Sequence, residues 1–259
     1  MDLRFTFNED AVNYDKIRPE YPMKMFHDIL NYTELDSSSS ALEIGIGTGQ
    51  ATTPILRTGC HITAVELGNN LANYTRYKFR NSSNLTVMNT SFEKFSPPQN
   101  QLYDLIYSGT AYHWIDPKVG HPKTINLLKP GAILALFWNH PFPNKDDDPV
   151  NRINKLIYNK YCPSNKKVEE FSINDCKKWI DTLTSIGFCD VTSKLYHRKR
   201  ELTSNEYILL LNTYSDHRTL PINIKTAFEN EMMQSINDLG GKINIYDTID
   251  LYLARKPFI

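Results

Sequence analysis

The strongest chemical signal in the chain is a glycine-rich turn between a short apolar run and an amphipathic one. Gly45, Gly47 and Gly49 alternate in the segment LEIGIGTGQ. Glycines at such a turn let the backbone approach a ligand closely, and the free N–H groups of the helix that follows attract electronegative atoms. Gln50 stands where the dinucleotide fingerprint has its third glycine, so the spacing departs from a nicotinamide site. A purely structural glycine turn is the alternative.

Two further strand ends carry side chains suited to a nucleoside. Glu66 ends an apolar run over 61–66, and a carboxylate there can accept both hydroxyls of a ribose. Ser91 and Phe92 follow the next apolar run, where Phe92 would flank an adenine ring and Ser91 would bond its polar edge. The alternatives are a solvent-exposed carboxylate at Glu66 and a buried loop aromatic at Phe92.

A second polar cluster lies far along the chain, in a loop expected between two helices. It contains Tyr214, Asp216, His217 and Arg218. A histidine and an arginine beside a tyrosine can anchor an anionic substrate, and loops often carry binding residues. The alternative is a solvated loop in which Asp216 caps a helix.

Charge and cysteine usage exclude several other functions. The 29 Lys and Arg residues balance the 29 Asp and Glu residues, so no bulk basic field for nucleic acid is expected. The four cysteines are scattered without a CxxC pair, which argues against a zinc ribbon and a disulfide scaffold. No metal site is expected either, because in the run Asp146–Asp148 the last aspartate precedes Pro149 as a helix cap does.

The hydrophobic pattern carries no sign of a membrane protein. The start of the chain lacks the apolar core of a signal peptide. The longest purely apolar run, over 132–138, is too short to span a bilayer. We therefore expect a cytoplasmic protein without a membrane partner.

The elements that must position these residues alternate between strand and helix. Short apolar runs predict strands over 41–44, 61–66, 84–88, 103–107 and 132–138. Amphipathic segments between them predict helices over about 50–57, 69–79 and 116–128. Continuous apolar strands that alternate with helices are typical of a parallel sheet covered on both faces.

The pattern changes after residue 139. Helices are predicted over about 150–161, 172–185 and 203–212, and strands over 188–198 and 243–254. A further helix begins at Pro221 and carries an apolar stripe, interpreted as core packing. The stripe consists of Ile224, Phe228, Met232, Ile236 and Leu239.

In their order and spacing, the motifs resemble those of the class I S-adenosylmethionine-dependent methyltransferases. The matching segments are LEIGIGTGQ, AVEL, NTSFEKF, YDLIYSGTAYHWID and LLKPGAILALFWN, which lie within about 36–140. The tail YDTIDLYLARKPF resembles that family's final antiparallel strand. The resemblance implies an α/β fold: a Rossmann-like seven-stranded sheet with the last strand antiparallel, helices on both faces and a helical lid insertion.

A narrower resemblance concerns the leader YDKIRPEYP, residues 14–22, together with the HW pair at 113–114. Both are similar to the small-molecule branch that includes trans-aconitate and related carboxylate methyltransferases. In that branch the leader folds over the cofactor, which implies that Tyr14 and Arg18 cover its methionine end and that Arg18 pairs with its carboxylate. The resemblance does not extend to 142–185, so the substrate is not carried over.

The family resemblance also implies residue roles. Those implied to cradle the amino-acid part and the sulfonium are Glu43, Gly45, Gly47, Gly49 and Gln50. Those implied to hold the ribose and adenine are Glu66, Leu67, Ser91 and Phe92. Those implied to line the floor near the methyl group are Ser108, Gly109 and Thr110.

His113 and Trp114 follow that floor. Histidine is the obvious candidate base because its unperturbed pKa lies nearest neutrality. A base is needed only if the acceptor loses a proton, as an alcohol, a phenol or an amine does, whereas a carboxylate needs none. His113 is therefore predicted as the catalytic base or as a contact of cofactor or substrate, with a packed histidine as a further alternative. Trp114 is predicted to wall the pocket, with Tyr214, His217 and Arg218 as further substrate contacts.

The predicted organisation has a leader over 1–35 and a core over 36–140 and 186–259. A helical insertion lies at about 203–240 within the core, and a helical substrate cap lies over 141–185. The predicted function is methyl transfer from S-adenosylmethionine to a small-molecule carboxylate, hydroxyl or amine, without metal or nucleic acid, by a monomer or homodimer. A non-catalytic S-adenosylmethionine-binding protein and a nucleotide-dependent oxidoreductase are the alternatives; turnover and a cofactor-swap binding assay discriminate them.

Overall fold

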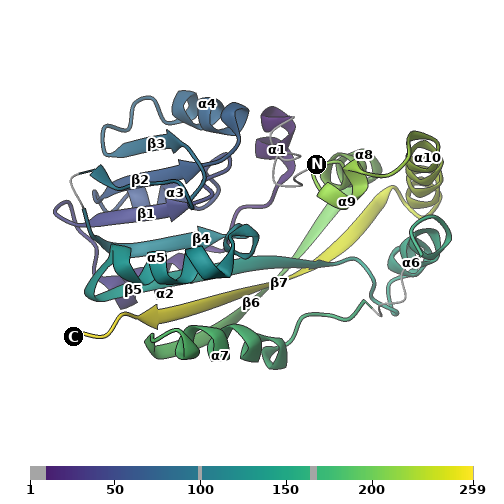
Figure 1. The fold of residues 1–259 in the computed structure, drawn as a ribbon. Helices are drawn as coiled ribbons and strands as arrows, with labels where there is room; N and C mark the ends of the chain where they lie inside the picture. The colour runs from purple at the N-terminus through teal and green to yellow at the C-terminus, as the bar shows by residue number, and fades with distance from the viewer. Residues whose placement is uncertain (1–9, 99–100, 164–167, 259) are drawn as a thin grey trace.

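Seven strands form one mixed sheet in the computed structural model, which describes residues 10–98, 101–163 and 168–258 (Figure 1). The first nine residues of the predicted leader lie outside these ranges. The strands are β1 (Ser40–Ile44), β2 (His61–Glu66), β3 (Leu85–Asn89), β4 (Tyr103–Gly109), β5 (Leu128–Phe142), β6 (Cys189–Thr203) and β7 (Lys242–Arg255).

The strand order is β3-β2-β1-β4-β5-β7-β6, and β1 to β5 pair in parallel. The last strand, β7, runs antiparallel to both of its neighbours, β5 and β6. The predicted seven-stranded sheet with an antiparallel last strand is therefore confirmed. Across the sheet, strand numbers fall from β3 to β1 and then rise from β4, so the switch point of the topology lies between β1 and β4. Open α/β sheets bind ligands at such a switch point.

The chain forms ten α-helices within the described residues. They are α1 (Ala11–Ile17), α2 (Met23–Thr33), α3 (Thr52–Leu56), α4 (Asn69–Lys78), α5 (Pro117–Leu127), α6 (Pro149–Tyr161), α7 (Lys177–Ser185), α8 (Ser204–Leu211), α9 (Ser215–Arg218) and α10 (Ile222–Asp238). Short 3-10 turns cover η3 (Tyr112–Trp114) and η4 (Ile173–Cys176).

Helices cover both faces of the sheet. On one face, α2 and α3 pack through Phe26 and Ile55. On the other face, α5 and α7 pack through Leu127 and Leu183. Because the central strands are buried from both sides, their sequences read as continuous apolar runs.

Local capping chemistry fixes several helix boundaries. The Asp148 carboxylate accepts hydrogen bonds from the backbone N–H groups of Val150 and Asn151, at 3.0 and 3.2 Å. This confirms the predicted cap at the start of α6. Thr203 and Glu206 form a capping box at the start of α8.

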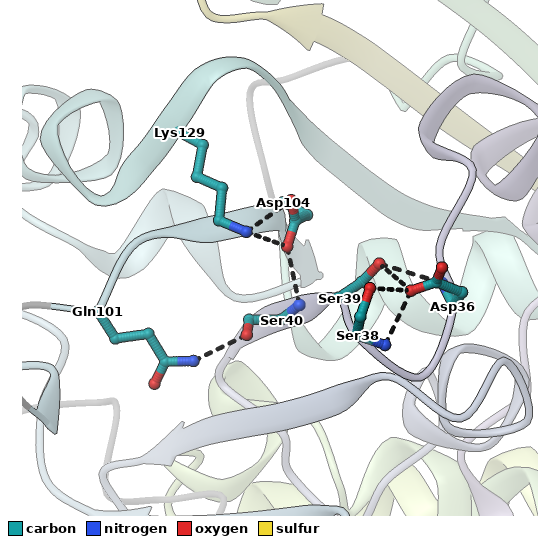
Figure 2. A network of polar contacts seen from close by, with 7 residues as sticks. All are labelled: Asp36, Ser38, Ser39, Ser40, Gln101, Asp104 and Lys129. Carbon is teal, nitrogen blue, oxygen red and sulfur yellow. Dashed lines mark hydrogen bonds and ion pairs between the residues drawn. The ribbon is translucent and has the colours of Figure 1, made fainter.

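A polar network closes the amino-terminal edge of the sheet (Figure 2). The Asp104 carboxylate accepts from the backbone N–H of Ser40 at 2.9 Å and from the Lys129 ammonium at 2.8 Å. Gln101 donates to the Ser40 hydroxyl at 2.9 Å. The starts of β1, β4 and β5 are thus tied together at the edge opposite to the strand ends that face ligands.

The strands β5, β6 and β7 extend beyond the rest of the sheet and carry a second group of helices (Figure 1). There α6, α8 and α10 share an apolar core that includes Ile157, Tyr207, Phe228 and Met232. We call α6, α8 and α10 the helical cluster. The interval 141–185 was predicted as one substrate cap, but its two α-helices lie in different parts of the molecule. Helix α6 belongs to the helical cluster, whereas α7 packs on the sheet.

Two local predictions need correction. The strand predicted over 132–138 is longer, because β5 begins at Leu128 and continues through Gly131, which adopts a φ of +78°. Leu239, predicted to continue the buried stripe of α10, follows the last helical residue and is 44% exposed. Phe228, Met232 and Ile236 of that stripe are buried as predicted.

Within the described ranges, no helix combines the length and apolar character that crossing a bilayer requires.

Candidate functional site

A cavity of about 310 Å³ lies at the carboxyl ends of the strands, across the switch point between β1 and β4. We call it the first cavity. Most of the predicted site residues line it, and they come from six separate segments of the chain. These residues are Tyr14, Arg18, Gly45, Gly47, Glu66, Leu67, Ser91, Phe92, Gly109, Thr110, His113, Trp114 and Tyr214.

Glu66 is held at the end of β2 by the glycine turn. One carboxylate oxygen accepts from the Gly47 N–H at 2.9 Å, and the other accepts from the Gly68 N–H at 2.8 Å. The side chain is 7% exposed, and burial raises its pKa. A carboxylate oxygen can accept more than one hydrogen bond, so Glu66 still has acceptor capacity for a ligand in the cavity.

Glu43 lies deeper, beneath the glycine turn. Its carboxylate accepts from the Thr52 hydroxyl at 2.7 Å and from the Tyr107 hydroxyl at 2.8 Å. Burial raises the pKa of Glu43 to about 8. With Gln50 it lines a smaller adjoining cavity of about 70 Å³. Glu43 therefore links β1, α3 and β4 under the turn.

Two of the residues predicted to bind the cofactor line neither of these cavities. Gly49 has a φ of +89°, and a Cβ there would lie 2.4 Å from a ring carbon of Phe79. It permits the close packing of the turn against the end of α4. Ser108 is fully buried and donates to the Ile44 carbonyl at 2.8 Å, so its hydroxyl joins β1 to β4.

The leader closes over the glycine turn through Arg18. The Arg18 guanidinium donates to the Thr213 carbonyl at 2.8 Å. Its central carbon lies 5.0 Å from the ring centroid of Tyr14 and 4.4 Å from that of Tyr214, within the range of cation–π contacts. The Arg18 Nε is buried and has no hydrogen-bond partner. A donor in that state suits an anionic ligand group.

The floor of the cavity turns sharply after β4. Thr110 has a φ of +54°, which is strained for a β-branched residue and costs of the order of 1–3 kcal/mol. Its N–H donates to the Phe137 carbonyl at 2.8 Å, and its hydroxyl lies 2.7 Å from the Tyr21 hydroxyl. A Cβ on Gly109 would lie 2.7 Å from the Phe137 ring. Tight packing thus holds the strained turn against the cavity.

His113 lines the cavity in a defined tautomer. The Trp138 indole N–H donates to Nδ1 of His113 at 2.8 Å. Indole nitrogen is a donor only, so Nδ1 is the acceptor and the neutral ring carries its proton on Nε2. Partial burial and the nearby ring of His140 lower the pKa of His113, which favours this neutral form.

The residues of the polar cluster at 214–218 do not all face the first cavity. Tyr214 and Asp216 line the first cavity, whereas His217 and Arg218 do not. Buried His217 lies with its Nε2 2.8 Å from the Tyr158 hydroxyl, and burial lowers its pKa. The Arg218 guanidinium donates to the Asn212 carbonyl at 2.7 Å. The histidine and the arginine that were predicted to contact a substrate therefore lie outside the lining of the first cavity.

Several lining residues were not predicted from the sequence. They are Ile44, Val65, Leu71, Thr90, Glu93, Ala111, Ile115, Asn139, Ser215 and Asp216. Asn139 is the informative one, because its amide donates to the buried carboxylate of Asp247 at 3.1 Å. Asp247 also pairs with Arg198 at 3.0 Å and with Arg200. The position of Asn139 at the carboxyl end of a parallel strand was the available signal.

In the part of the chain that the structure describes, no group of three or more His, Cys, Asp or Glu side chains could hold a metal ion.

Comparisons with known proteins agree with this fold. A family model described as ribosomal RNA adenine dimethylase matches residues 22–117. An uncharacterized methyltransferase-like protein of Schizosaccharomyces pombe is 27% identical over 226 residues, which are 85% of this chain and 81% of the relative. The chain is therefore related to methyltransferases by sequence as well as by fold.

Solved structures are similar at low sequence identity. A candidate type II methyltransferase from Anaeromyxobacter dehalogenans has a TM-score of 0.64 at 16% identity, covering 93% of this chain and 98% of that one. Phosphoethanolamine N-methyltransferase 2 of Haemonchus contortus, solved with S-adenosylhomocysteine, has a TM-score of 0.56 at 12% identity, covering 99% of this chain and 60% of that one. The shared fold is that of class I methyltransferases. Together with the sequence relatives, it supports S-adenosylmethionine-dependent methyltransferase as the class of this enzyme.

Proposed function

We propose that this S-adenosylmethionine-dependent methyltransferase methylates a small molecule, in a chamber that the chain itself closes. The observation that carries the proposal is the contact between Arg18 and Thr213, which joins the leader to the segment before α9 beside the first cavity, which Arg18 lines. Tyr14 and Tyr214 flank this contact. A roof built from the chain's own side chains suits an acceptor that is enclosed, rather than a macromolecule that lies across an open face.

The described residues fit S-adenosylmethionine on chemical grounds. Glu66 offers acceptors for the ribose hydroxyls, and Ser91 and Phe92, which line the same cavity, are proposed to hold the adenine. The unpartnered Nε of Arg18 offers a donor to the carboxylate of the amino-acid part. Gly45 allows the glycine turn to pack closely against Ala111, because a Cβ at position 45 would lie 2.4 Å from the Cβ of Ala111.

When bound, S-adenosylmethionine supplies an electrophilic methyl group on its sulfonium. The protein's task is then alignment and exclusion of water. Tyr21 and Phe137 fix the turn at Thr110, which forms the floor. The Nε2–H group of His113 can donate a hydrogen bond to the cofactor or the substrate, because the Trp138 indole N–H already donates to its Nδ1. In this role His113 binds and orients and does not remove a proton.

The match to the ribosomal RNA adenine dimethylase model raises RNA as an alternative substrate. That match spans 22–117, which is the part of the chain that holds β1 to β4 and the glycine turn. It ends before the helical cluster and before Tyr214 and Asp216. The formal charge of zero also gives no general attraction to phosphates. Both facts favour a small acceptor, as does the resemblance of the leader to the trans-aconitate-type branch.

The test uses S-adenosylmethionine labelled in the methyl group. The protein is incubated with a metabolite extract passed through a small-pore filter and, separately, with ribosomal RNA. We expect label in the low-mass fraction, and its loss in Glu66→Ala. Label in RNA alone would overturn the proposal. Binding of S-adenosylhomocysteine without transfer to either pool would favour the non-catalytic alternative.

A further inference from the structure

A second cavity, of about 1040 Å³, lies between the helical cluster and the outer parts of β5 and β7. Its volume is at the upper end of the range for small-molecule sites. Tyr214 and Asp216 line both this second cavity and the first one. The two cavities therefore share a wall that consists of one aromatic ring and one carboxylate.

The second cavity has more apolar than polar surface, and its lining also includes the charged side chains Asp146, Lys155, Glu169 and Glu170. Its walls include Phe142 from β5, Leu210 and Leu211 from α8, and Ile245 from β7. The polar groups of two tyrosines there already have partners within the protein. The Tyr207 hydroxyl donates to Asn154 at 2.8 Å, and the Tyr158 hydroxyl lies 2.8 Å from Nε2 of His217. Such a surface favours a ligand with an aromatic or aliphatic body.

The ionisable group of the shared wall is the Asp216 carboxylate, while the Arg18 guanidinium, which lines the first cavity, lies 4.4 Å from the centroid of the Tyr214 ring. Asp216 is exposed, and the hydrogen bond to its carboxylate comes from the N–H of the next residue, His217, at 3.0 Å. Within the described ranges no cation pairs with this carboxylate. Burial lowers the pKa of His217, which favours its neutral form, and Arg18 lines the first cavity but not the second. A ligand that spans the wall meets a carboxylate beside an aromatic ring, a setting that favours a cation over an anion.

We infer that the second cavity holds the methyl acceptor and that the acceptor is an amine on an apolar body, with its nitrogen at the wall formed by Tyr214 and Asp216. The inference rests on the proposed methyl transfer and names its substrate class. It selects the amine from the three acceptor classes that the sequence left open, because a carboxylate at this wall would be repelled by Asp216.

The transfer step balances without a base on the protein. The bound ammonium first loses one proton to water. The lone pair of the neutral amine nitrogen then forms the N–C bond, while the electron pair of the S–C bond stays on sulfur. The positive charge moves from sulfur to nitrogen, so the product is an ammonium that again faces Asp216. His113, held as an Nε2–H donor, takes no proton in this scheme.

The test measures binding and does not depend on turnover. S-adenosylhomocysteine binding is first measured by calorimetry, and the ligand is then kept at saturation so that it occupies the first cavity. The neutral fluorophore N-phenyl-1-naphthylamine reports the second cavity by its increase in emission. It is displaced by 3-phenylpropylamine, 3-phenylpropanol or 3-phenylpropionate, which share one body and differ in the head group.

Two sets of variants assign the signal. Leu211→Trp fills the second cavity, and Leu220→Trp fills it from a less buried position; Leu209→Trp on the same helix as Leu211 is the matched control, because Leu209 is 39% exposed. Asp216→Asn keeps an oxygen for the His217 N–H and removes the charge. We expect both filling variants to abolish fluorophore binding while the control and S-adenosylhomocysteine binding stay unchanged.

The head-group series tests the substrate class. The amine should displace the fluorophore at a concentration at least about tenfold lower than the carboxylate does, which corresponds to roughly 1.4 kcal/mol, and Asp216→Asn should remove most of this difference. Equal or better displacement by the carboxylate would overturn the amine assignment. Fluorophore binding that survives both filling variants would overturn the cavity assignment. Failure of S-adenosylhomocysteine to bind would instead count against the proposed function.

Discussion

The indole N–H of Trp138 donates to Nδ1 of His113 at 2.8 Å, from β5 to the turn that follows β4. This contact determines which nitrogen of His113 carries the proton, because indole cannot accept a hydrogen bond. A histidine that looks like a general base in the sequence is thereby presented to the cavity as a donor. The contact joins residues of two separate elements, and neither residue alone predicts it.

The tautomer of His113 is directly measurable. In protein labelled with ¹⁵N-histidine, two-dimensional NMR should show His113 at neutral pH with a protonated Nε2 and an unprotonated Nδ1. His113→Gln identifies the resonance. Trp138→Phe removes the donor, so the preference for this tautomer should weaken. A protonated Nδ1 in the unmodified protein would contradict the arrangement and restore His113 as a candidate base.

Glu66→Ala should weaken the binding of S-adenosylhomocysteine and of adenosine alike, because both carry the ribose that Glu66 is proposed to hold. Hydrogen bonds to charged groups contribute about 1.5–3 kcal/mol, so a loss of the order of 10–100-fold in each affinity is expected. Calorimetric titration measures it. Unchanged adenosine binding in a folded variant would show that Glu66 supports the Gly47 turn without contacting the ribose.

Arg18→Ala should affect the binding of S-adenosylhomocysteine and of adenosine differently. It should weaken the binding of S-adenosylhomocysteine, whose carboxylate Arg18 is proposed to meet, and leave adenosine binding within about threefold of the original value. Arg80→Ala is the matched control, because Arg80 is exposed and also lies over a tyrosine ring, 4.6 Å from the centroid of Tyr77. An equal loss for both ligands would indicate that Arg18 acts only by closing the roof.

The buried carboxyl of Glu43 predicts a dependence of stability on pH. Burial raises its pKa to about 8 in the folded protein, from 4.5 for an exposed carboxyl. Between these values the folded state binds more protons than the unfolded state, so this group's contribution to stability falls as pH rises towards 8. In urea unfolding from pH 5 to 8, Glu43→Gln should lose most of this decline. The same slope in both proteins would contradict the raised pKa.

Much of the fold could be predicted from the sequence, because each strand from β1 to β4 is a short apolar run bounded by a turn or a cap. The glycine turn and Glu66 could be placed at one ligand edge for the same reason, since parallel strands end together. Capping residues such as Asp148 also act over two or three positions in sequence. These features are local or follow from the topology.

The rest depends on contacts between distant segments. The length of β5 depends on its pairing with β7 over ten positions, from Ile133 opposite Arg255 to Phe142 opposite Tyr246. The orientation of the 214–218 segment depends on Arg18, 195 residues before Thr213. His217 turns towards Tyr158 and Arg218 towards Asn212 for reasons of packing. Sequence spacing could therefore group these residues but could not say which of them faces a ligand.

The most direct test of the central claim is thermal unfolding of the purified protein with S-adenosylhomocysteine, S-adenosylmethionine and NADH in parallel. A ligand at 100 times its dissociation constant adds about 2.7 kcal/mol to the free energy of unfolding. We expect a clear rise in Tm with the two adenosyl compounds and none with NADH, and a smaller rise in Glu66→Ala. A shift with NADH alone, or with none of the three, would contradict the assignment of this chain as an S-adenosylmethionine-dependent methyltransferase.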